Sequence, residues 1–471
     1  MNLTAQFLAE TANGRWINLD NDKITISSVF TDTREKSLNG LFVALVGENF
    51  DAHNLLEDAA KSGAIALCVE EGRYKPALNK QKLPALLVKD TLKALQDISK
   101  AYRQSLTGLT LIGVTGSNGK TSTKEILSQV LAQEFGEDAV YATKANTNNH
   151  IGVPLNILKL TPDHRYAVIE LGTNHPGEIY TLADIARPDI AIITSIGASH
   201  LEFFKSVYGV AEEKATIFNY FDASQESKNL AVIPDELLKC KVIREKLYNQ
   251  NFMTFAEEGH GKPSISYKEL SSSIEGSSFN LSWQNQAISE TIRWTVHGKH
   301  QMGNGAIAAL VAAHLGITSS NIAKHLGNCH LTGMRMKIRK SGYTTIINDA
   351  YNANPTSAKA GLVWLSGVLS KESPERNFIV IGDMLELGEA GSALHKDVLQ
   401  TYLSLMSDCT LILVGTIMAE AIKSLHVRKA LLFQNSDLAA EYIRENIKDI
   451  DTIYLKGSRG TKLEKIDQVF P

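Results

Sequence analysis

The chain has 471 residues, of which 44% are apolar and 21% charged, as is usual for a soluble globular protein. This length predicts about three domains. The 48 basic and 51 acidic residues leave a formal net charge of −3, so the composition indicates neither a nucleic-acid partner nor an anionic membrane surface.

The first 106 residues combine short strands and helices. Apolar runs rich in branched residues predict strands over residues 40–47 and 64–71. Residues 52–64 between them have helical spacing, and residues 91–106 predict a helix that leads into the next domain.

From residue 107 onward, strands and helices alternate. The pattern of the middle of the chain predicts buried parallel strands over residues 109–115, 166–172 and 189–197 and helices over residues 121–135 and 300–316. Residues 257–298 alternate polar and apolar side chains between Ser/Gly turns, which predicts a small antiparallel patch.

A second alternating series begins after residue 331. Its predicted strands lie over residues 344–350, 378–384, 410–415 and 452–457. The chain is therefore predicted to be an α/β protein of three units, residues 1–106, 107–331 and 332–471, the last two with mostly parallel sheets.

The sequence indicates no cysteine metal site, no secretory signal and no membrane-spanning helix. The cysteines, Cys68, Cys240, Cys329 and Cys409, lack metal-ligand spacing, so we expect reduced thiols. The N-terminus does not have the pattern of a secretory signal, and no apolar run reaches the ~18 residues of a membrane-spanning helix. We expect a cytoplasmic, monomeric protein.

The sharpest local motif is the glycine-rich turn GVTGSNGKTS over residues 113–122. It departs from the strict phosphate-loop pattern, because Val114 stands where that pattern has glycine. Its glycines let the backbone wrap around phosphate oxygens, Lys120 can reach the β- and γ-phosphates, and the Thr121 hydroxyl can bind Mg²⁺. The predicted nucleotide contacts are Gly116, Ser117, Asn118, Gly119, Lys120, Thr121 and Ser122.

A phosphate loop does not identify the reaction. Two classes remain, an enzyme that activates a carboxylate with ATP and a switch driven by nucleotide hydrolysis. An enzyme that joins molecules needs sites for further substrates, which a switch does not.

Further motifs carry a resemblance to one family. In order along the chain they are TGSNGKTST, ANTNNHIGVPLNIL, IELGTNHPGEI, SIGASHLEFF, GKHQMGN, TGMRMK, NDAYNANPTS, GDMLELGEAGSALH and LKGSRGTKLE. Together they resemble the Mur ligase family over nearly the whole chain. The resemblance implies a UDP-substrate domain, a central ATP-binding phosphate-loop domain and a Rossmann-like C-terminal domain that binds a dipeptide and closes on ATP.

The implied reaction is ATP-dependent addition of D-alanyl-D-alanine to UDP-N-acetylmuramoyl-tripeptide. ATP phosphorylates the terminal carboxylate, and the dipeptide amine then attacks the acyl phosphate. In the family pattern Glu170, His200 and Thr121 match Mg²⁺ ligands. Lys214 matches a lysine that carries a carbamate and bridges to a second Mg²⁺, so the implied cofactors are ATP, one or two Mg²⁺ and this carbamate.

Other positions match the nucleotide site of the family. His300 and Asn304 match the segment near adenine, although Gln301 stands where the family usually has Asn. Arg335 matches an arginine that reaches the γ-phosphate from the C-terminal domain, and Asp349 matches the ribose contact. The implied catalytic residues are Lys120, His200, Lys214 and Arg335.

Polar clusters in all three units match substrate positions. The implied substrate residues are Asp32, Thr33, Arg34, Asp51, His53, Asn146, Thr147, Asn148, Asn149, Tyr351, Asn352, Asn354, Lys456, Ser458 and Arg459. Residues 146–149 could equally form a simple turn, and Glu386 and His395 are as compatible with structural hydrogen bonds as with the site. The alternatives are a folylpolyglutamate-type ligase, an earlier Mur step and a phosphate-loop switch ATPase.

Overall fold

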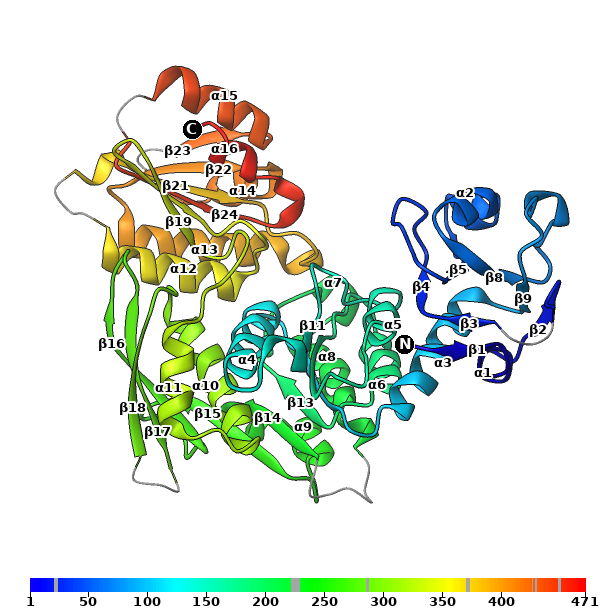
Figure 1. Ribbon diagram of the computed structural model, residues 1–471. Helices are drawn as coiled ribbons and strands as arrows, with labels where there is room; N and C mark the ends of the chain where they lie inside the picture. Colours follow the sequence, from blue (N-terminus) through cyan, green and yellow to red (C-terminus); the bar gives the residue numbers. More distant parts are fainter. Residues whose placement is uncertain are drawn as a thin grey trace.

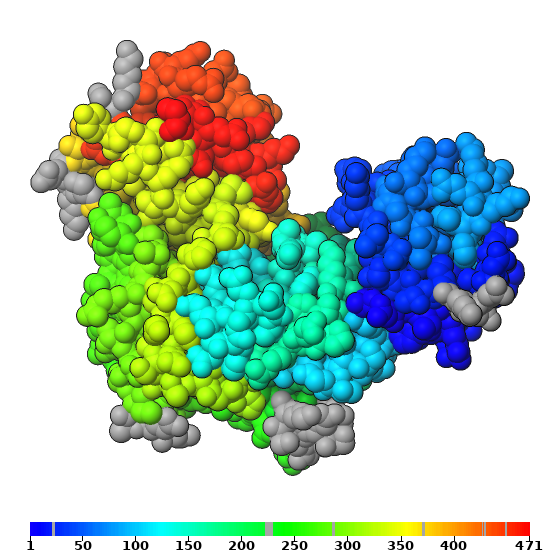
Figure 2. Space-filling view, viewed as in Figure 1, coloured from blue at the N-terminus to red at the C-terminus, as the bar shows by residue number. Residues whose placement is uncertain are grey.

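The computed structural model describes residues 1–20, 24–221, 229–284, 288–369, 373–425, 427, 430–447 and 450–471. Three sheet-centred units follow one another along the chain (Figure 1). The C-terminal unit sits on the central one, and the N-terminal unit extends to one side. Figure 2 shows the surface hollowed between the blue N-terminal unit and the yellow and red C-terminal unit.

The N-terminal unit is built on a sheet with the strand order β2–β9–β8–β5–β4. These strands are Arg15–Ile17, Ala85–Val88, Ala64–Glu70, Gly40–Val43 and Ser28–Phe30, with β2 antiparallel and the others parallel. Short antiparallel pairs join β1 (Leu3–Thr4) to β3 (Thr25–Ile26) and β6 (Val46–Gly47) to β7 (Phe50–Asp51). The helices are α1 (Ala5–Thr11), α2 (Leu56–Lys61) and α3 (Thr91–Ser105).

Helix α3 joins the first two units. It begins where the Asp90 carboxylate accepts a hydrogen bond from the Lys93 N–H, an N-cap worth about 1 kcal/mol. Its apolar face lies in the core shared by the N-terminal sheet and the central unit. Lys100 and Asp184 also form an ion pair at 2.8 Å between this helix and α6 (Glu178–Ala186). The predicted linking helix is thus confirmed.

The central sheet has the order β11–β12–β10–β13–β14–β15–β16–β17–β18. The strands are Val140–Ala142, Tyr166–Glu170, Thr110–Thr115, Ile190–Ile193, Leu230–Pro234, Phe252–Glu257, Ile265–Ser272, Ser277–Trp283 and Ile288–Trp294. Besides α6, the helices are α4 (Lys120–Phe135), α5 (Gly152–Ile157), α7 (Leu201–Phe204), α8 (Val207–Ala215), α9 (Lys241–Lys246), α10 (Lys299–His314) and α11 (Ser319–Gly327).

The predicted antiparallel patch is confirmed for β16, β17 and β18, but it is not a separate sheet. β16 also pairs in parallel with β15, with Phe255 opposite Ile265, so the parallel sheet continues into the antiparallel strands. The sequence pattern could not show this, because strand alternation does not reveal which strand lies alongside.

The C-terminal sheet has the order β19–β20–β24–β21–β22–β23. The strands are Lys337–Ser341, Thr344–Asn348, Thr452–Lys456, Asn377–Gly382, Thr410–Val414 and Ala430–Phe433, with β19 antiparallel to β20. The helices are α12 (Pro355–Val368), α13 (Gly391–Met406), α14 (Thr416–Ile422), α15 (Ser436–Asn446) and α16 (Glu464–Asp467). The α/β class is confirmed, while the charged edge strand β19 and the short β23 were not predicted.

Candidate active site

The glycine-rich turn connects the C-terminal end of β10 to the first turn of α4. Gly116 has φ +152° and Gly119 has φ +84°, both in the region that favours glycine. A Cβ atom on Gly116 would lie 1.9 Å from Thr194 Oγ1, so a side chain there is sterically excluded. The predicted strand, loop and helix are confirmed. The N-terminus of α4 faces the concave side of the glycine-rich loop.

The segment after β13 holds the loop in shape. The backbone N–H of Ser117 donates to Ser195 O, and that of Asn118 donates to Ser195 Oγ, both at 2.9 Å. Ser199 Oγ donates to Ser117 Oγ at 2.9 Å. Sequence reasoning did not assign Ser195 and Ser199 a role, although small polar residues directly after a buried strand were the available signal.

Helix α10 supports the loop from behind. Thr123 in α4 donates its hydroxyl to Asn304 Oδ1 at 3.1 Å, and Asn304 Nδ2 donates to Gln301 Oε1 at 2.7 Å. Gln301, where the family pattern usually has Asn, is therefore the partner of Asn304. Burial lowers the pKa of the His300 ring, the charge of Asp349 opposes this shift, and the charge of Lys456 adds to it.

Lys120 and Arg335 lie near one another across the two units. Lys120 Nζ donates to Gly116 O at 2.7 Å. Burial lowers the pKa of Lys120, Glu170 opposes this shift, and the positive charge of Arg335 adds to it. The Arg335 guanidinium stacks 3.8 Å from the centre of the Tyr351 ring. Two cations therefore gather beside a loop shaped for phosphate.

Glu170 ends β12, the neighbour of β10, so its carboxylate reaches the loop. Its oxygens accept hydrogen bonds of 2.9 Å from Thr121 Oγ1 and Asn148 Nδ2. Carboxylate and hydroxyl oxygens are the ligands that Mg²⁺ prefers, so Thr121 and Glu170 fit the ion. The described residues contain no group of three or more His, Cys, Asp or Glu side chains suited to a metal ion.

His200 faces the C-terminal unit. Its Nδ1 atom lies 2.5 Å from Glu386 Oε2, and its backbone has φ +51°. This close contact crosses from the central unit to the C-terminal unit. Glu386 thus joins two units.

Lys214 in α8 is 1% exposed. Burial, followed by the positive charge of Lys120, holds the pKa of Lys214 well below its ordinary value, and Glu213 opposes this only in part. The carboxylate of Glu213 accepts the backbone N–H groups of Gly177 and Ile179 at 2.7 Å each. Lys214 is therefore a buried amine whose neutral form is more accessible than that of an exposed lysine.

The C-terminal unit presents a paired carboxylate to the site. Asp349 Oδ2 accepts from Lys456 Nζ at 2.7 Å and from Tyr454 OH at 3.3 Å, while Asp349 Oδ1 accepts from the Met336 N–H. Lys456 is 5% exposed, so its charge is held within this pair. Arg459 is exposed and forms an ion pair with Glu464 at 3.2 Å.

The loop before α12 touches the phosphate loop directly. Asn354 caps α12 in a reciprocal capping box with Ser357, and its Nδ2 atom donates to Asn118 Oδ1 at 2.7 Å. The hydroxyl of Ser458 accepts the Leu385 N–H at 3.0 Å, and Asn352 Oδ1 accepts the N–H of Ala353. The bridge between Asn354 and Asn118 was not foreseen.

Two polar residues of the GDMLELGEAGSALH segment have structural partners. His395 is completely buried, accepts the Met384 N–H at Nε2 and donates from Nδ1 to Gly391 O. Asp383 accepts the N–H groups of Ile417 and Met418 at the start of α14. For His395, the structural interpretation therefore holds.

The substrate residues predicted in the N-terminal unit form two clusters. Arg34 bonds to Asp32 through its backbone N–H and guanidinium, which lowers the pKa of Asp32 to about 2, and the Thr33 carbonyl accepts from a serine hydroxyl. His53 is enclosed, since its Nδ1 atom bonds to Asp51 Oδ1 and its Nε2 atom accepts the Glu70 N–H.

The ANTNNHIG loop lies beside Glu170. Asn148 links to it directly, whereas Asn149 Oδ1 accepts the N–H groups of Ile151 and Gly152 in a local turn. Asn146 accepts from Asn148, and Thr147 donates to the Lys144 carbonyl. Thr147 and Asn149 therefore make local turn contacts, whereas Asn148 reaches Glu170.

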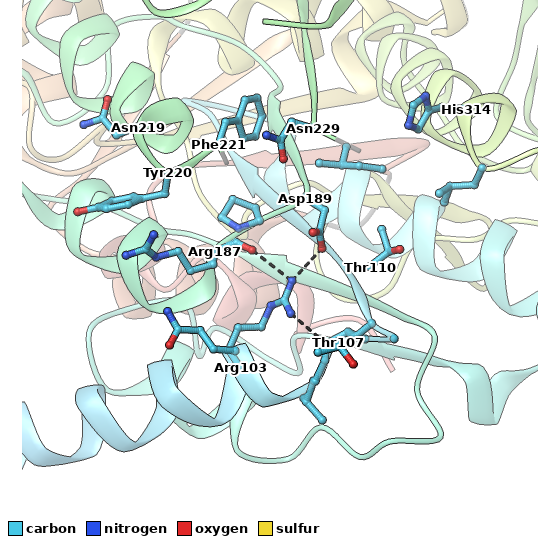
Figure 3. Close-up of a pocket in the computed structure, with 17 residues that line it drawn as sticks. Arg103, Thr107, Thr110, Arg187, Asp189, Asn219, Tyr220, Phe221, Asn229 and His314 are labelled. Carbon is cyan, nitrogen blue, oxygen red and sulfur yellow. Dashed lines mark hydrogen bonds and ion pairs between the residues drawn. The ribbon is translucent and has the colours of Figure 1, made fainter. Parts of the chain in front are cut away.

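A separate cavity of about 970 Å³ lies near the first residues of β10 and β13, the opposite edge of the sheet from the phosphate loop (Figure 3). Its charged side chains Arg103, Asp189 and Arg187 have partners within the chain. Arg103 pairs with Asp189 at 2.8 Å, and the Arg187 guanidinium lies 4.4 Å from the centre of the Tyr220 ring. This cavity is remote from the chemistry described above.

Residues 114–313 match the Mur ligase middle domain, and residues 334–459 match the Mur ligase glutamate ligase domain. The chain belongs to the Mur ligase family. A UDP-N-acetylmuramoyl-tripeptide–D-alanyl-D-alanine ligase from Bacillus subtilis is 35% identical over 98% of this chain and 97% of its own length. The family resemblance inferred from the motifs is thereby confirmed.

Solved structures agree with this Mur ligase assignment. A crystal structure of MurF from Acinetobacter baumannii has a TM-score of 0.87 and 28% identity, covering 99% of this chain and 98% of that one. MurF from Thermotoga maritima in complex with ADP has a TM-score of 0.78 and 26% identity, with 94% and 96% covered. The predicted Mur ligase architecture is confirmed. No helix in the described ranges is long and apolar enough to cross a bilayer.

Proposed function

We propose that this chain joins D-alanyl-D-alanine to UDP-N-acetylmuramoyl-tripeptide with ATP, through an acyl phosphate, in the synthesis of peptidoglycan precursors. The observation that carries the proposal is the meeting of two units at one phosphate loop, where Asn354 donates to Asn118 at 2.7 Å. The charges of Glu170 and Arg335 both act on Lys120 of this loop. A switch that only hydrolyses nucleotide would not need the further polar loops that surround this point. The predicted cytoplasmic location and monomeric state remain predictions.

Different residues would bind the nucleotide and the metal ion. The loop from Gly116 to Ser122 would hold the phosphates of ATP, and Arg335 would stabilise the charge of the transferring phosphoryl group. His300, Asn304 and Asp349 would surround the nucleoside. Thr121, Glu170 and His200 would bind Mg²⁺, which would neutralise phosphate charge. For His200 this requires its Nε2 atom, because Nδ1 is paired with Glu386.

Lys214 is proposed to carry a carbamate. A neutral amine attacks CO₂, forms an N–C bond and releases a proton, and the depressed pKa of Lys214 favours the neutral amine. The new carboxylate would bridge to a second Mg²⁺. Carbon-13 bicarbonate should label wild-type protein and not the Lys214→Ala variant, whose activity should be low. Full activity in that variant contradicts the proposal.

The remaining polar residues are proposed substrate contacts. Arg34, with Asp32, Thr33, Asp51 and His53, would bind the UDP group of the substrate. The loop over residues 146–149 would bind its sugar and peptide. The dipeptide would meet Asn352 and Asn354 in the loop after Tyr351, together with Lys456, Ser458 and Arg459. The units 1–106, 107–331 and 332–471 would then correspond to UDP substrate, ATP and dipeptide.

Phosphate release by the purified chain tests the reaction. The assay contains Mg²⁺-ATP with a UDP-muramoyl tripeptide that ends in lysine or in diaminopimelate, each with and without D-alanyl-D-alanine. Steady release only with a tripeptide and the dipeptide together is expected, and it also shows which third residue is accepted. Release with neither substrate points to a switch ATPase, and activity with folate and glutamate instead points to the folylpolyglutamate type.

A further inference from the structure

The Arg335 guanidinium is supported by an aromatic ring rather than by a carboxylate. It lies 3.8 Å from the centre of the Tyr351 ring. Its one hydrogen bond within the described chain is a long one, from Nη1 to Thr332 O at 3.4 Å, and no ion pair to Arg335 is found there. A cation over an aromatic face is attracted by the ring quadrupole without using an N–H donor.

This support leaves the charge and the donors of Arg335 available. A carboxylate partner would have accepted N–H bonds and cancelled the charge. Instead, the charge of Arg335 acts on both Lys120 and Lys124 in the first turns of α4. A planar guanidinium with free donors beside these lysines suits the oxygens of a phosphoryl group in transfer.

The ring is itself held in place by a loop that contacts the phosphate loop. The Tyr351 N–H donates to Met334 O at 3.1 Å, which ties the ring to the turn that carries Arg335. Three residues further on, Asn354 donates to Asn118 of the phosphate loop at 2.7 Å. The ring, the arginine and the phosphate loop therefore form one connected unit.

We propose that Tyr351 is a positioning residue for phosphoryl transfer, which holds Arg335 toward the γ-phosphate, rather than a residue that recognises the dipeptide. The proposal rests on the ligase function proposed above. It predicts that Tyr351 matters before the dipeptide binds, in the step in which the tripeptide carboxylate attacks the γ-phosphorus and ADP leaves.

Single-turnover ADP formation isolates this step. The enzyme is mixed with ATP, Mg²⁺ and the UDP-linked tripeptide without dipeptide, and the first equivalent of ADP is timed. Tyr351→Leu should slow ADP formation about tenfold, the scale of a lost cation–π contact. Tyr351→Phe keeps the ring and should restore most of the rate. Tyr343→Leu, at a fully exposed tyrosine, is the matched control and should leave the rate unchanged.

A double-variant cycle shows whether Tyr351 acts through Arg335. In an Arg335→Ala background, Tyr351→Leu should cause little further loss, because the group that the ring positions is gone. Unchanged single-turnover ADP formation in Tyr351→Leu, with a raised KM for the dipeptide, overturns the proposal and assigns the ring to dipeptide binding. Additive losses in the double variant also overturn it. If wild-type enzyme forms no ADP with any tripeptide, the proposed function fails instead.

Discussion

Polar contacts join the central unit to the C-terminal unit, whereas the N-terminal unit has no such contacts with the C-terminal unit in the described part of the chain. Between the central and C-terminal units, Asn354 bonds to Asn118 and Glu386 lies against His200. Residues 1–90 make no hydrogen bond or ion pair with residues 332–471 among the residues that the structure describes. The proposed phosphate-transfer site is thus assembled from the central and C-terminal units, whereas the proposed UDP-binding surface of the N-terminal unit has no such bond to the C-terminal unit within the described ranges.

This contrast assigns different kinetic roles to the two halves. Groups that meet at the phosphate loop should act on the rate of the chemical step. Groups on the separate N-terminal surface should act on substrate binding, since they lie away from the reacting atoms. The following substitutions test that division, and the first two do so most directly.

Lys120→Met should have the largest effect. Removal of the cation beside the loop is expected to lower the rate of ADP formation about a thousandfold, the scale seen when a group that stabilises transition-state charge is lost. Lys120 makes one hydrogen bond, to Gly116 O, so folding should be retained. Stopped reactions analysed for ADP measure the rate, and the exposed Lys239→Met is the control. A rate within tenfold of wild type would contradict the assignment of the loop.

Arg34→Ala should act on binding alone. The Arg34 side chain is 88% exposed and bonds to Asp32, so it can turn to a diphosphate without rearranging a core. We expect the KM for the UDP-linked tripeptide to rise about tenfold at unchanged kcat, because charge-assisted hydrogen bonds are about twice as strong as neutral ones. Steady-state kinetics compare it with Arg15→Ala, an exposed arginine of the same unit. A loss of kcat would break the proposed division.

The sequence predicted best what depends on neighbours along the chain. The phosphate loop could be placed because a strand pattern precedes it and a helix pattern follows. The family resemblance named Thr121 and Glu170 as ligands of one metal ion, and their side chains do meet, beside the ends of the adjacent parallel strands β10 and β12. The order of the motifs, carried by the family resemblance, indicated the C-terminal partners.

Contacts between units could not be predicted from the sequence. Asn354 and Asn118 are 236 positions apart, and no local pattern reveals that their amides meet. Contacts within one unit can also escape a motif: both ring nitrogens of His53, which was predicted to bind substrate, are engaged with Asp51 and Glu70. Whether a polar side chain is free or already satisfied depends on packing, which a motif does not record.

Glu386→Gln tests the joint between the central and C-terminal units. The contact between Glu386 and His200 is half-exposed, and such pairs contribute about 0.2–1 kcal/mol. We therefore expect the arrangement in which the central and C-terminal units are apart to gain about two- to threefold in population. Small-angle scattering should show a larger radius of gyration without nucleotide, and the exposed Glu389→Gln is the control. Identical wild-type profiles with and without substrates and an ATP analogue would contradict domain closure.

The smallest effect is expected from Asp51→Asn, which probes the N-terminal unit by itself. Burial raises the pKa of Asp51, but hydrogen bonds from His53 and Arg73 outweigh it, so the net pKa is lowered. Stability from this carboxylate is therefore present above its unfolded pKa of about 3.9 and lost as the pH falls through the lower folded value. At pH 7 we expect about 1 kcal/mol or less, because the side chain is partly exposed.

Hydrogen exchange of the β8 amides measures this difference, because the Glu70 N–H is bonded to the His53 ring that Asp51 holds. Wild type should be better protected than the variant at pH 7. The gap should begin to narrow as the pH falls below about 4 and should close once Asp51 is protonated in the folded chain as well. Asp58→Asn, at an exposed carboxylate of the same unit, should show no gap. A gap that widens in acid would mean that Asp51 is held by burial rather than by its partners, and that the N-terminal cluster is not a fixed scaffold for Arg34.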